Sequence, residues 1–125
     1  MTVSRSVVAL ALMAGLTLPV AVHAQDAAAG EAVFKRQCGI CHSPVAGKNM
    51  VGPSLFGVIG RTAGTVPGFH YSQANKTSGI TWDAARLDPY LTNPREVVPG
   101  TTMAFAGLKD AQQRGNLIAY LATLK

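Results

Sequence analysis

The stretch Cys38-Gly39-Ile40-Cys41-His42 is the most informative part of this 125-residue sequence. It holds both cysteines of the chain, separated by two residues and followed directly by a histidine. On one helical turn, this spacing brings two thiols to the edge of a planar group and turns the next residue toward its centre. The pattern predicts covalent attachment of haem c, in which both thiols add across vinyl groups and His42 lies under the iron.

Other interpretations of the two cysteines remain open at this point. A thioredoxin-like redox pair would stand in a βαβ setting, which the flanking residues do not show. A zinc site needs four ligands, and beyond residue 24 the chain offers only these two cysteines, His42 and the distant His70. An exported protein with two cysteines would ordinarily form one disulfide, so a haem-free disulfide protein is a third alternative.

The first 24 residues have the pattern of a secretory signal peptide. Arg5 supplies the basic start, residues 7–18 form a 12-residue apolar stretch, and Val22-His23-Ala24 provides a small-residue cleavage site. The apolar stretch is too short to span a bilayer. We therefore expect cleavage after Ala24, a signal peptide at 1–24 and one periplasmic domain at 25–125 without stable membrane insertion.

The charge of the expected mature chain is modest and dispersed. Without Arg5, ten Lys and Arg face six Asp and Glu, a net charge of +4, and only Lys35 and Arg36 are adjacent. Such a distribution is unlike that of a nucleic-acid-binding protein, so we expect no nucleic-acid partner. A mildly acidic protein surface is the better candidate. A domain this small has a thin core unless another group fills it.

A second iron ligand would decide the class of haem protein. Beyond residue 24 the methionines are Met50, eight residues after His42, and Met103, in a turn-rich segment after Pro99-Gly100. Met50 is too close in sequence to His42 to reach the opposite face of a haem. Histidine and methionine sulfur together make a closed electron-transfer centre, whereas an open position indicates a small haem peroxidase or a ligand-sensing haem protein. A lone methionine is also a common core residue.

Many shorter motifs accompany the cysteine pair in order along residues 30–121. They are Gly30 to Phe34, Gly52-Pro53, Gly60-Arg61, Gly68-Phe69, Gly79-Ile80-Thr81-Trp82, Tyr90-Leu91, Asn93-Pro94, Pro99-Gly100-Thr101 with Met103, and Leu117 to Leu121. With these motifs the chain resembles the class I cytochromes c of the mitochondrial type and their bacterial periplasmic relatives. The resemblance implies an all-α fold, with short helices wrapped around one haem held through Cys38 and Cys41.

The resemblance also implies roles for residues around the haem. His42 and Met103 are the implied iron ligands, and the carbonyl of Pro53 is the implied acceptor for the ring proton of His42. The residues implied near a buried propionate are Arg61, Tyr71 and Trp82. The polar cluster implied beside Met103 consists of Asn75, Tyr90 and Thr101. His70 matches no family ligand and is expected at the surface.

The function implied by the resemblance is one-electron transfer by a monomer, not enzymatic catalysis. The implied partners are membrane redox complexes, namely a quinol-oxidising complex, a terminal oxidase or a photosynthetic reaction centre, or else a periplasmic dehydrogenase. Beyond residue 24 the chain has only five lysines, fewer than the lysine ring of mitochondrial relatives. We expect an apolar contact patch that consists of Ile40, Val45, Ala104 and Phe105.

The expected elements follow from periodicity and capping residues. Residues 27–38 should form the first helix, and Asp110 should cap a last helix with an apolar stripe at Leu117, Tyr120, Leu121 and Leu124. By resemblance these two helices cross at Gly30. Residues 43–80 lack sustained periodicity and are expected to form a long wall around the cofactor. Asp88-Pro89 has the pattern of an N-cap and first helical residue, which predicts a kink or two short helices there.

Overall fold

The computed structural model describes residues 25–125, so the predicted signal peptide and its cleavage site lie outside the described residues. The elements are five helices: α1 (Ala27–Gln37), α2 (Gln73–Thr77), α3 (Ala84–Thr92), α4 (Pro94–Val97) and α5 (Ala111–Leu121). Within this range there is no strand, only an isolated antiparallel bridge between Thr62 and Thr81. The all-α prediction is confirmed.

Helix α1 ends where the attachment motif begins. Its N-cap is Asp26, whose side chain accepts hydrogen bonds from the backbone N–H groups of Ala28 and Ala29, at 2.8 and 3.2 Å. Its C-cap is Cys38, whose N–H donates to the Phe34 carbonyl. The helix therefore delivers the first cysteine at its carboxyl end, within one residue of the predicted boundary.

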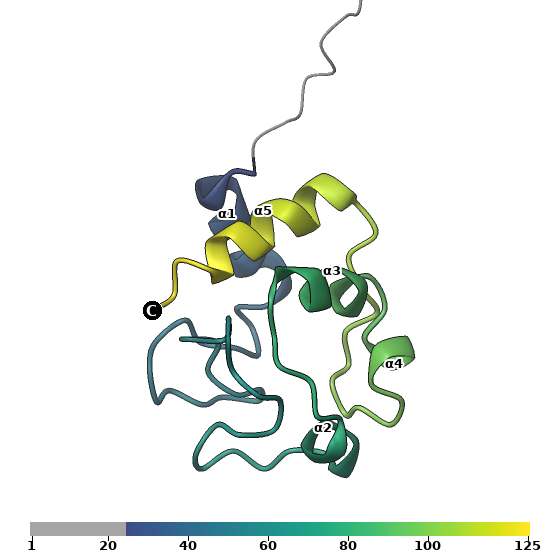
Figure 1. Ribbon diagram of the computed structural model, residues 1–125. Helices are drawn as coiled ribbons and strands as arrows, with labels where there is room; N and C mark the ends of the chain where they lie inside the picture. The colour runs from purple at the N-terminus through teal and green to yellow at the C-terminus, as the bar shows by residue number, and fades with distance from the viewer. Residues whose placement is uncertain (1–24) are drawn as a thin grey trace, which may run out of the picture.

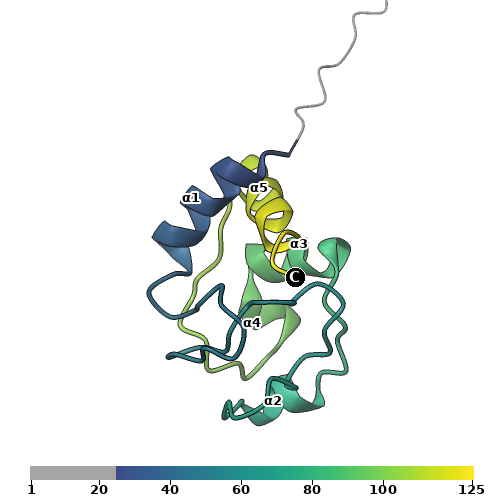
Figure 2. The same ribbon diagram turned by 90° about the vertical axis from the view of Figure 1, so that its left-hand side faces the viewer.

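Helices α1 and α5 cross, as the views in Figures 1 and 2 show. A Cβ at Gly30 would lie 1.9 Å from the carbonyl oxygen of Asn116, so the two backbones touch there. Phe34 packs beside this crossing against Tyr120, with ring centroids 5.3 Å apart. Leu117 is fully buried. The first and last helices thus pack directly against each other.

Helix α3 passes through Pro89, so the predicted division into two short helices at this proline is wrong, while the predicted kink stays a prediction. The N-cap is Asp83, whose side chain accepts from Arg86 N at 2.7 Å, and the helix ends only at Asn93. The next helix, α4, then starts with Pro94. Two short helices do exist in this region, but their boundary lies four residues beyond Pro89.

Burial explains why the helix tolerates Pro89. A proline inside a helix removes one hydrogen bond, here the bond to the carbonyl of Ala85. Both residues are exposed, so water can solvate the freed carbonyl. The opposite face of α3 is anchored in the core by Leu87, Tyr90 and Leu91. Tertiary packing therefore outweighs the local signal of Asp88-Pro89.

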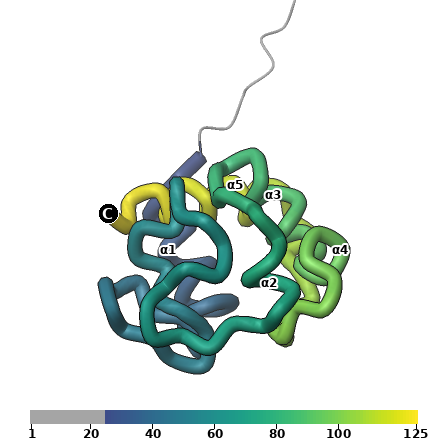
Figure 3. Tube along the Cα trace, turned by 60° about the horizontal axis from the view of Figure 1, so that its bottom comes forward, coloured from purple at the N-terminus to yellow at the C-terminus, as the bar shows by residue number. Residues whose placement is uncertain are grey.

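Residues 43–80 form the broad loops that Figure 3 shows between α1 and α3. The expected long wall is present, although it contains α2, a short helix that periodicity did not predict. The side chain of Ser72 caps α2 by accepting from Asn75 N at 3.2 Å. The backbone of Trp82 joins the wall to α3, since Trp82 N donates to Arg61 O at 2.9 Å.

Candidate functional site

The attachment motif forms a turn directly after α1. The N–H groups of Cys41 and His42 both donate to the Cys38 carbonyl, at 3.0 and 2.9 Å, which compacts the five residues. Both cysteines are free, half-buried thiols. Burial raises the pKa of the Cys38 thiol to about 11, and Cys41 adds to the shift. As a free side chain, Cys38 is therefore a neutral thiol at physiological pH.

His42 is held by one nitrogen and leaves the other available. Its Nδ1 lies 2.7 Å from the carbonyl oxygen of Pro53, which orients the ring and leaves Nε2 as the nitrogen that could bind iron. Burial lowers the pKa of His42; the bond to Pro53 opposes this, and Arg61 adds a smaller lowering. Neutral imidazole is the form that ligates a metal.

Gly52 makes room for the His42 ring. A Cβ at position 52 would lie 2.3 Å from Cε1 and 2.6 Å from Nδ1 of His42. The N–H of Gly52 also donates to the Cys41 carbonyl at 2.8 Å, so the loop returns against the attachment motif. The sequence contained Gly52-Pro53 as a family motif, but only the structure shows that the glycine itself touches the ring.

Met103 lies in an irregular segment between α4 and α5 and is half-buried against the core. The Tyr90 hydroxyl donates toward its sulfur at 3.9 Å, and Met103 N donates to Thr101 Oγ1 at 3.3 Å. Burial raises the pKa of Tyr90 to about 12, while a hydrogen bond with Thr101 opposes the shift. The phenol thus remains a proton donor at the sulfur.

The structure brings Tyr90 and Thr101 to Met103, whereas the place of Asn75 beside Met103 stays a prediction. Asn75 lies in α2, and its hydrogen bonds to Ser72 and Ser78 run through its backbone. Hydrogen bonds join Met103 to two members of the predicted polar cluster, Tyr90 and Thr101. His70 is exposed, in keeping with its expected place at the surface.

The wall of loops connects the three residues that are predicted near a buried propionate, namely Arg61, Tyr71 and Trp82. The Arg61 guanidinium donates from Nη1 to the carbonyls of Ser54 and Phe56, at 2.9 and 3.2 Å. Tyr71 is buried, and its hydroxyl accepts from Val66 N at 3.1 Å. The Trp82 ring packs on Tyr90 with centroids 4.5 Å apart, which connects this group to the Met103 side.

The donors fit a haem rather than a bare metal ion. Two neighbouring thiols suit covalent attachment, and a neutral imidazole with one free nitrogen and a thioether suit the two axial positions of a haem iron. Among residues 25–125, no three His, Cys, Asp or Glu side chains gather as a bare ion would require. The imidazole ring of His42 occupies the space that a side chain at position 52 would fill.

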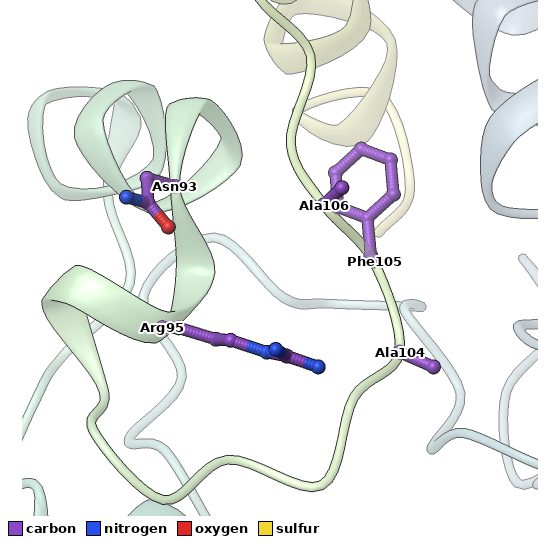
Figure 4. A pocket seen from close by; sticks show the side chains of 5 residues that line it. All are labelled: Asn93, Arg95, Ala104, Phe105 and Ala106. Carbon is purple, nitrogen blue, oxygen red and sulfur yellow. The ribbon is translucent and has the colours of Figure 1, made fainter.

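Two surface hollows lie near these segments. One, of about 450 Å³, lies between α1 and the attachment loop and is lined in part by Ile40, Met50 and Tyr120. The other, of about 250 Å³, lies between α4 and the Met103 segment. Figure 4 shows Arg95 reaching from α4 toward the strip of chain that carries Ala104.

The predicted contact patch is only partly exposed. Ile40 and Val45 are 78% and 55% exposed, and Ala104 is exposed, but Phe105 is half-buried against the core. Sequence reasoning missed Val51, which is 79% exposed. It also missed Asn49, whose side chain bridges two loops through Ser54 N and Pro67 O. An asparagine in a Gly- and Pro-rich loop gives no distinct signal in a single sequence.

Within residues 25–125, no helix is long and apolar enough to cross a membrane.

Comparisons with known proteins agree on one family. The family model described as Cytochrome c matches residues 27–125. Cytochrome c of Euglena viridis is 51% identical over 100 residues, covering 80% of this chain and 98% of the relative. Cytochrome c2 of Rhodomicrobium vannielii is 57% identical over 102 residues, covering 80% of each chain.

A solved structure shows the same fold. Cytochrome cH from Methylobacterium extorquens superposes with a TM-score of 0.73 at 47% sequence identity, covering 78% of this chain and 98% of that one. Together with the attachment motif and the helical architecture, these matches show that the chain belongs to the cytochrome c family: it is an all-α electron-transfer protein, not an enzyme, with one haem c covalently bound through Cys38 and Cys41.

Proposed function

We propose that this chain is a periplasmic one-electron carrier in which His42 Nε2 and Met103 Sδ would bind the haem iron. The bound haem c supplies an iron that gains and loses one electron without making or breaking covalent bonds. The observation that carries the proposal is the 2.7 Å contact between His42 Nδ1 and the Pro53 carbonyl, because it leaves Nε2 as the ring nitrogen for a metal.

The residues around the two ligands keep both in place. Pro53 fixes the tautomer and plane of the His42 ring, and Gly52, which has no side chain, leaves the room that the ring occupies. On the other side, Thr101 holds the backbone of Met103 while the Tyr90 phenol donates toward the sulfur. A fixed ligand set suits electron transfer, because little has to rearrange when the charge changes.

Arg61, Tyr71 and Trp82 would hold the carboxylate end of the haem. Burial lowers the pKa of Arg61, and Tyr71 opposes the shift; an arginine nevertheless remains protonated in a folded protein. Its guanidinium is fixed by two backbone carbonyls, so it can offer its other N–H groups to a carboxylate without losing much conformational freedom. Asn75, which lies on α2, is also proposed to line the haem environment.

The proposed cellular setting follows from the leader and from the family. Cleavage after Ala24 would release a monomeric domain of residues 25–125 in the periplasm. The proposed electron donor is a quinol-oxidising membrane complex or a dehydrogenase, and the proposed acceptor is a terminal oxidase or a photosynthetic reaction centre. Support comes from bacterial relatives named cytochrome c2 in Rhodomicrobium vannielii and Blastochloris viridis, which are 57% and 56% identical to this chain.

The ligand assignment can be tested by spectroscopy of the oxidised holoprotein. The wild type should show the near-infrared charge-transfer band of a methionine sulfur bound to ferric iron. Met103→Ala should lose the band, and Met50→Leu, the matched change at the 42% exposed second methionine, should keep it. Loss of the band in Met50→Leu alone would refute the assignment.

A further inference from the structure

Asn49 is connected to His42 through a single peptide group. Its Nδ2 donates to the Pro67 carbonyl at 3.1 Å, and its Oδ1 accepts from Ser54 N at 3.0 Å. That N–H belongs to the same peptide group as the Pro53 carbonyl, which in turn accepts from His42 Nδ1 at 2.7 Å. A continuous series of hydrogen bonds therefore runs from Pro67 through two amide groups to the imidazole.

The bonds of this series all point in one direction. Each amide donates with its N–H toward Pro67 and accepts with its oxygen on the side of His42. Hydrogen bonds arranged head to tail polarise one another, because donation from an amide N–H makes the oxygen of the same amide a better acceptor. The estimated strengthening is roughly 10–30% per bond. Asn49 thus makes the Pro53 oxygen more negative.

The peptide group between Asn49 and His42 is held firmly. Ser54 is only 3% exposed, and its hydroxyl donates to the Val45 carbonyl at 2.6 Å. Its own carbonyl accepts from Arg61 Nη1 at 2.9 Å. With these contacts made, the Pro53–Ser54 peptide cannot turn away from either neighbour without breaking several partly buried hydrogen bonds, so the polarisation acts at a fixed geometry.

We propose that Asn49 is a positioning residue for electron transfer, which tunes His42 through the Pro53–Ser54 peptide. A more negative Pro53 oxygen draws the Nδ1 proton and makes the ring a stronger electron donor at Nε2. A stronger donor favours the ferric state, so Asn49 lowers the reduction potential of the bound haem. This inference rests on the proposed ligation by His42 and adds a residue that does not itself contact the ring.

The test compares three variants of the holoprotein by potentiometry and by proton NMR of the reduced form. Asn49→Ala should raise the reduction potential and move the His42 Nδ1 proton resonance upfield, as expected for a weaker hydrogen bond. Asn49→Asp keeps an acceptor for Ser54 N and adds negative charge, so it should move the resonance downfield. The control is Asn116→Ala, which also deletes a side-chain bond to a distant backbone N–H, that of Asp26 at 2.9 Å.

The outcomes separate this inference from the ligand assignment. Wild-type His42 ring protons should show the large upfield ring-current shifts of a group held over the haem; their absence would overturn the ligation itself. If Asn49→Ala lowers only the melting temperature, with the potential and the resonance as in Asn116→Ala, then Asn49 merely ties two loops and the inference is wrong. Should Asn49→Ala fail to fold, the resonance in Asn49→Asp decides.

Discussion

Gly52 lies so close to His42 that the space between them cannot hold a methyl group. The nearest ring atom would be 2.3 Å from a Cβ on residue 52, well inside contact distance. The backbone of Gly52 is not in the left-handed region, so its requirement for glycine is one of space and not of conformation.

We therefore expect Gly52→Ala to displace the His42 ring or to break the bond from Gly52 N to Cys41 O. Overpacking of a dense interior typically costs about 1–3 kcal/mol. The free energy of unfolding of the holoprotein should fall by that amount, with a change in the visible spectrum. Gly39→Ala, where a new Cβ would lie 3.3 Å from the nearest atom, is the control. Equal effects of the two changes would contradict the steric argument.

The two helical glycines should respond oppositely to the same substitution. At Gly30 a Cβ would lie 1.9 Å from the Asn116 carbonyl oxygen, so alanine must push α1 and α5 apart. At Gly115 the nearest atoms belong to the flexible Gln25 side chain, and alanine should stabilise α5 by up to about 1 kcal/mol. Thermal unfolding should show a clear loss for Gly30→Ala and a rise of a few degrees for Gly115→Ala. A stabilised Gly30→Ala would refute the close crossing.

The folded state should depend on haem attachment. The domain is small, and its wall of loops contains only one short helix of its own, α2. Replacement of Cys38 and Cys41 together by alanine should leave a largely unfolded or degraded product. Circular dichroism of the purified variant and its periplasmic yield would measure this. A stable, cooperatively folded double variant without haem would show that the core is sufficient by itself.

Alkaline pH should destabilise the protein through Tyr90. Its pKa is about 12 in the folded state against 10.0 for an ordinary tyrosine, because burial disfavours the phenolate. A raised folded pKa gives stability that is complete below pH 10 and is lost as the pH rises to about 12. At about 1.4 kcal/mol per pKa unit, the loss amounts to roughly 2–3 kcal/mol. Tyr90→Phe should flatten this part of the denaturation profile; an unchanged slope would exclude Tyr90 as its source.

Docking to the redox partner should depend only moderately on salt. The segments that flank the attachment motif and Met103 carry few basic residues, and Ile40 within the motif and Val45 just after it are strongly exposed. Long-range steering grows with the number of charges that face the partner. Stopped-flow rates should therefore fall little between low and physiological ionic strength, and Ile40→Ser should slow association more than Ile59→Ser. A loss of several decades with salt would mean that charge dominates.

The sequence could predict those parts of the fold that have local signals. Asp26 and Asp110 cap α1 and α5 as such residues should. The crossing at Gly30, in contrast, is implied only by the family resemblance. The attachment motif identified both cysteines because covalent haem attachment requires this spacing between the two thiols and His42. A periodicity argument could not find α2, since five residues are too few to repeat.

Other features depend on contacts between distant segments. Pro89 is a local signal for a helix start, but burial of Leu87 and Leu91 on the other face keeps α3 continuous. The role of Gly52 is visible only once the loop has returned against His42. The bridge made by Asn49 joins residues 18 positions apart, and no pattern in one sequence reports it.

The crossing of α1 with α5 constrains the order of events during maturation. The attachment motif directly follows α1 near the beginning of the domain, whereas its packing partner α5 comes last in the chain. If the proposed leader directs export from the amino end, the thiols would reach the periplasm while α5 is still behind the membrane. Until translocation is complete, α1 would have no α5 to pack against, which would leave the cysteines accessible for haem attachment.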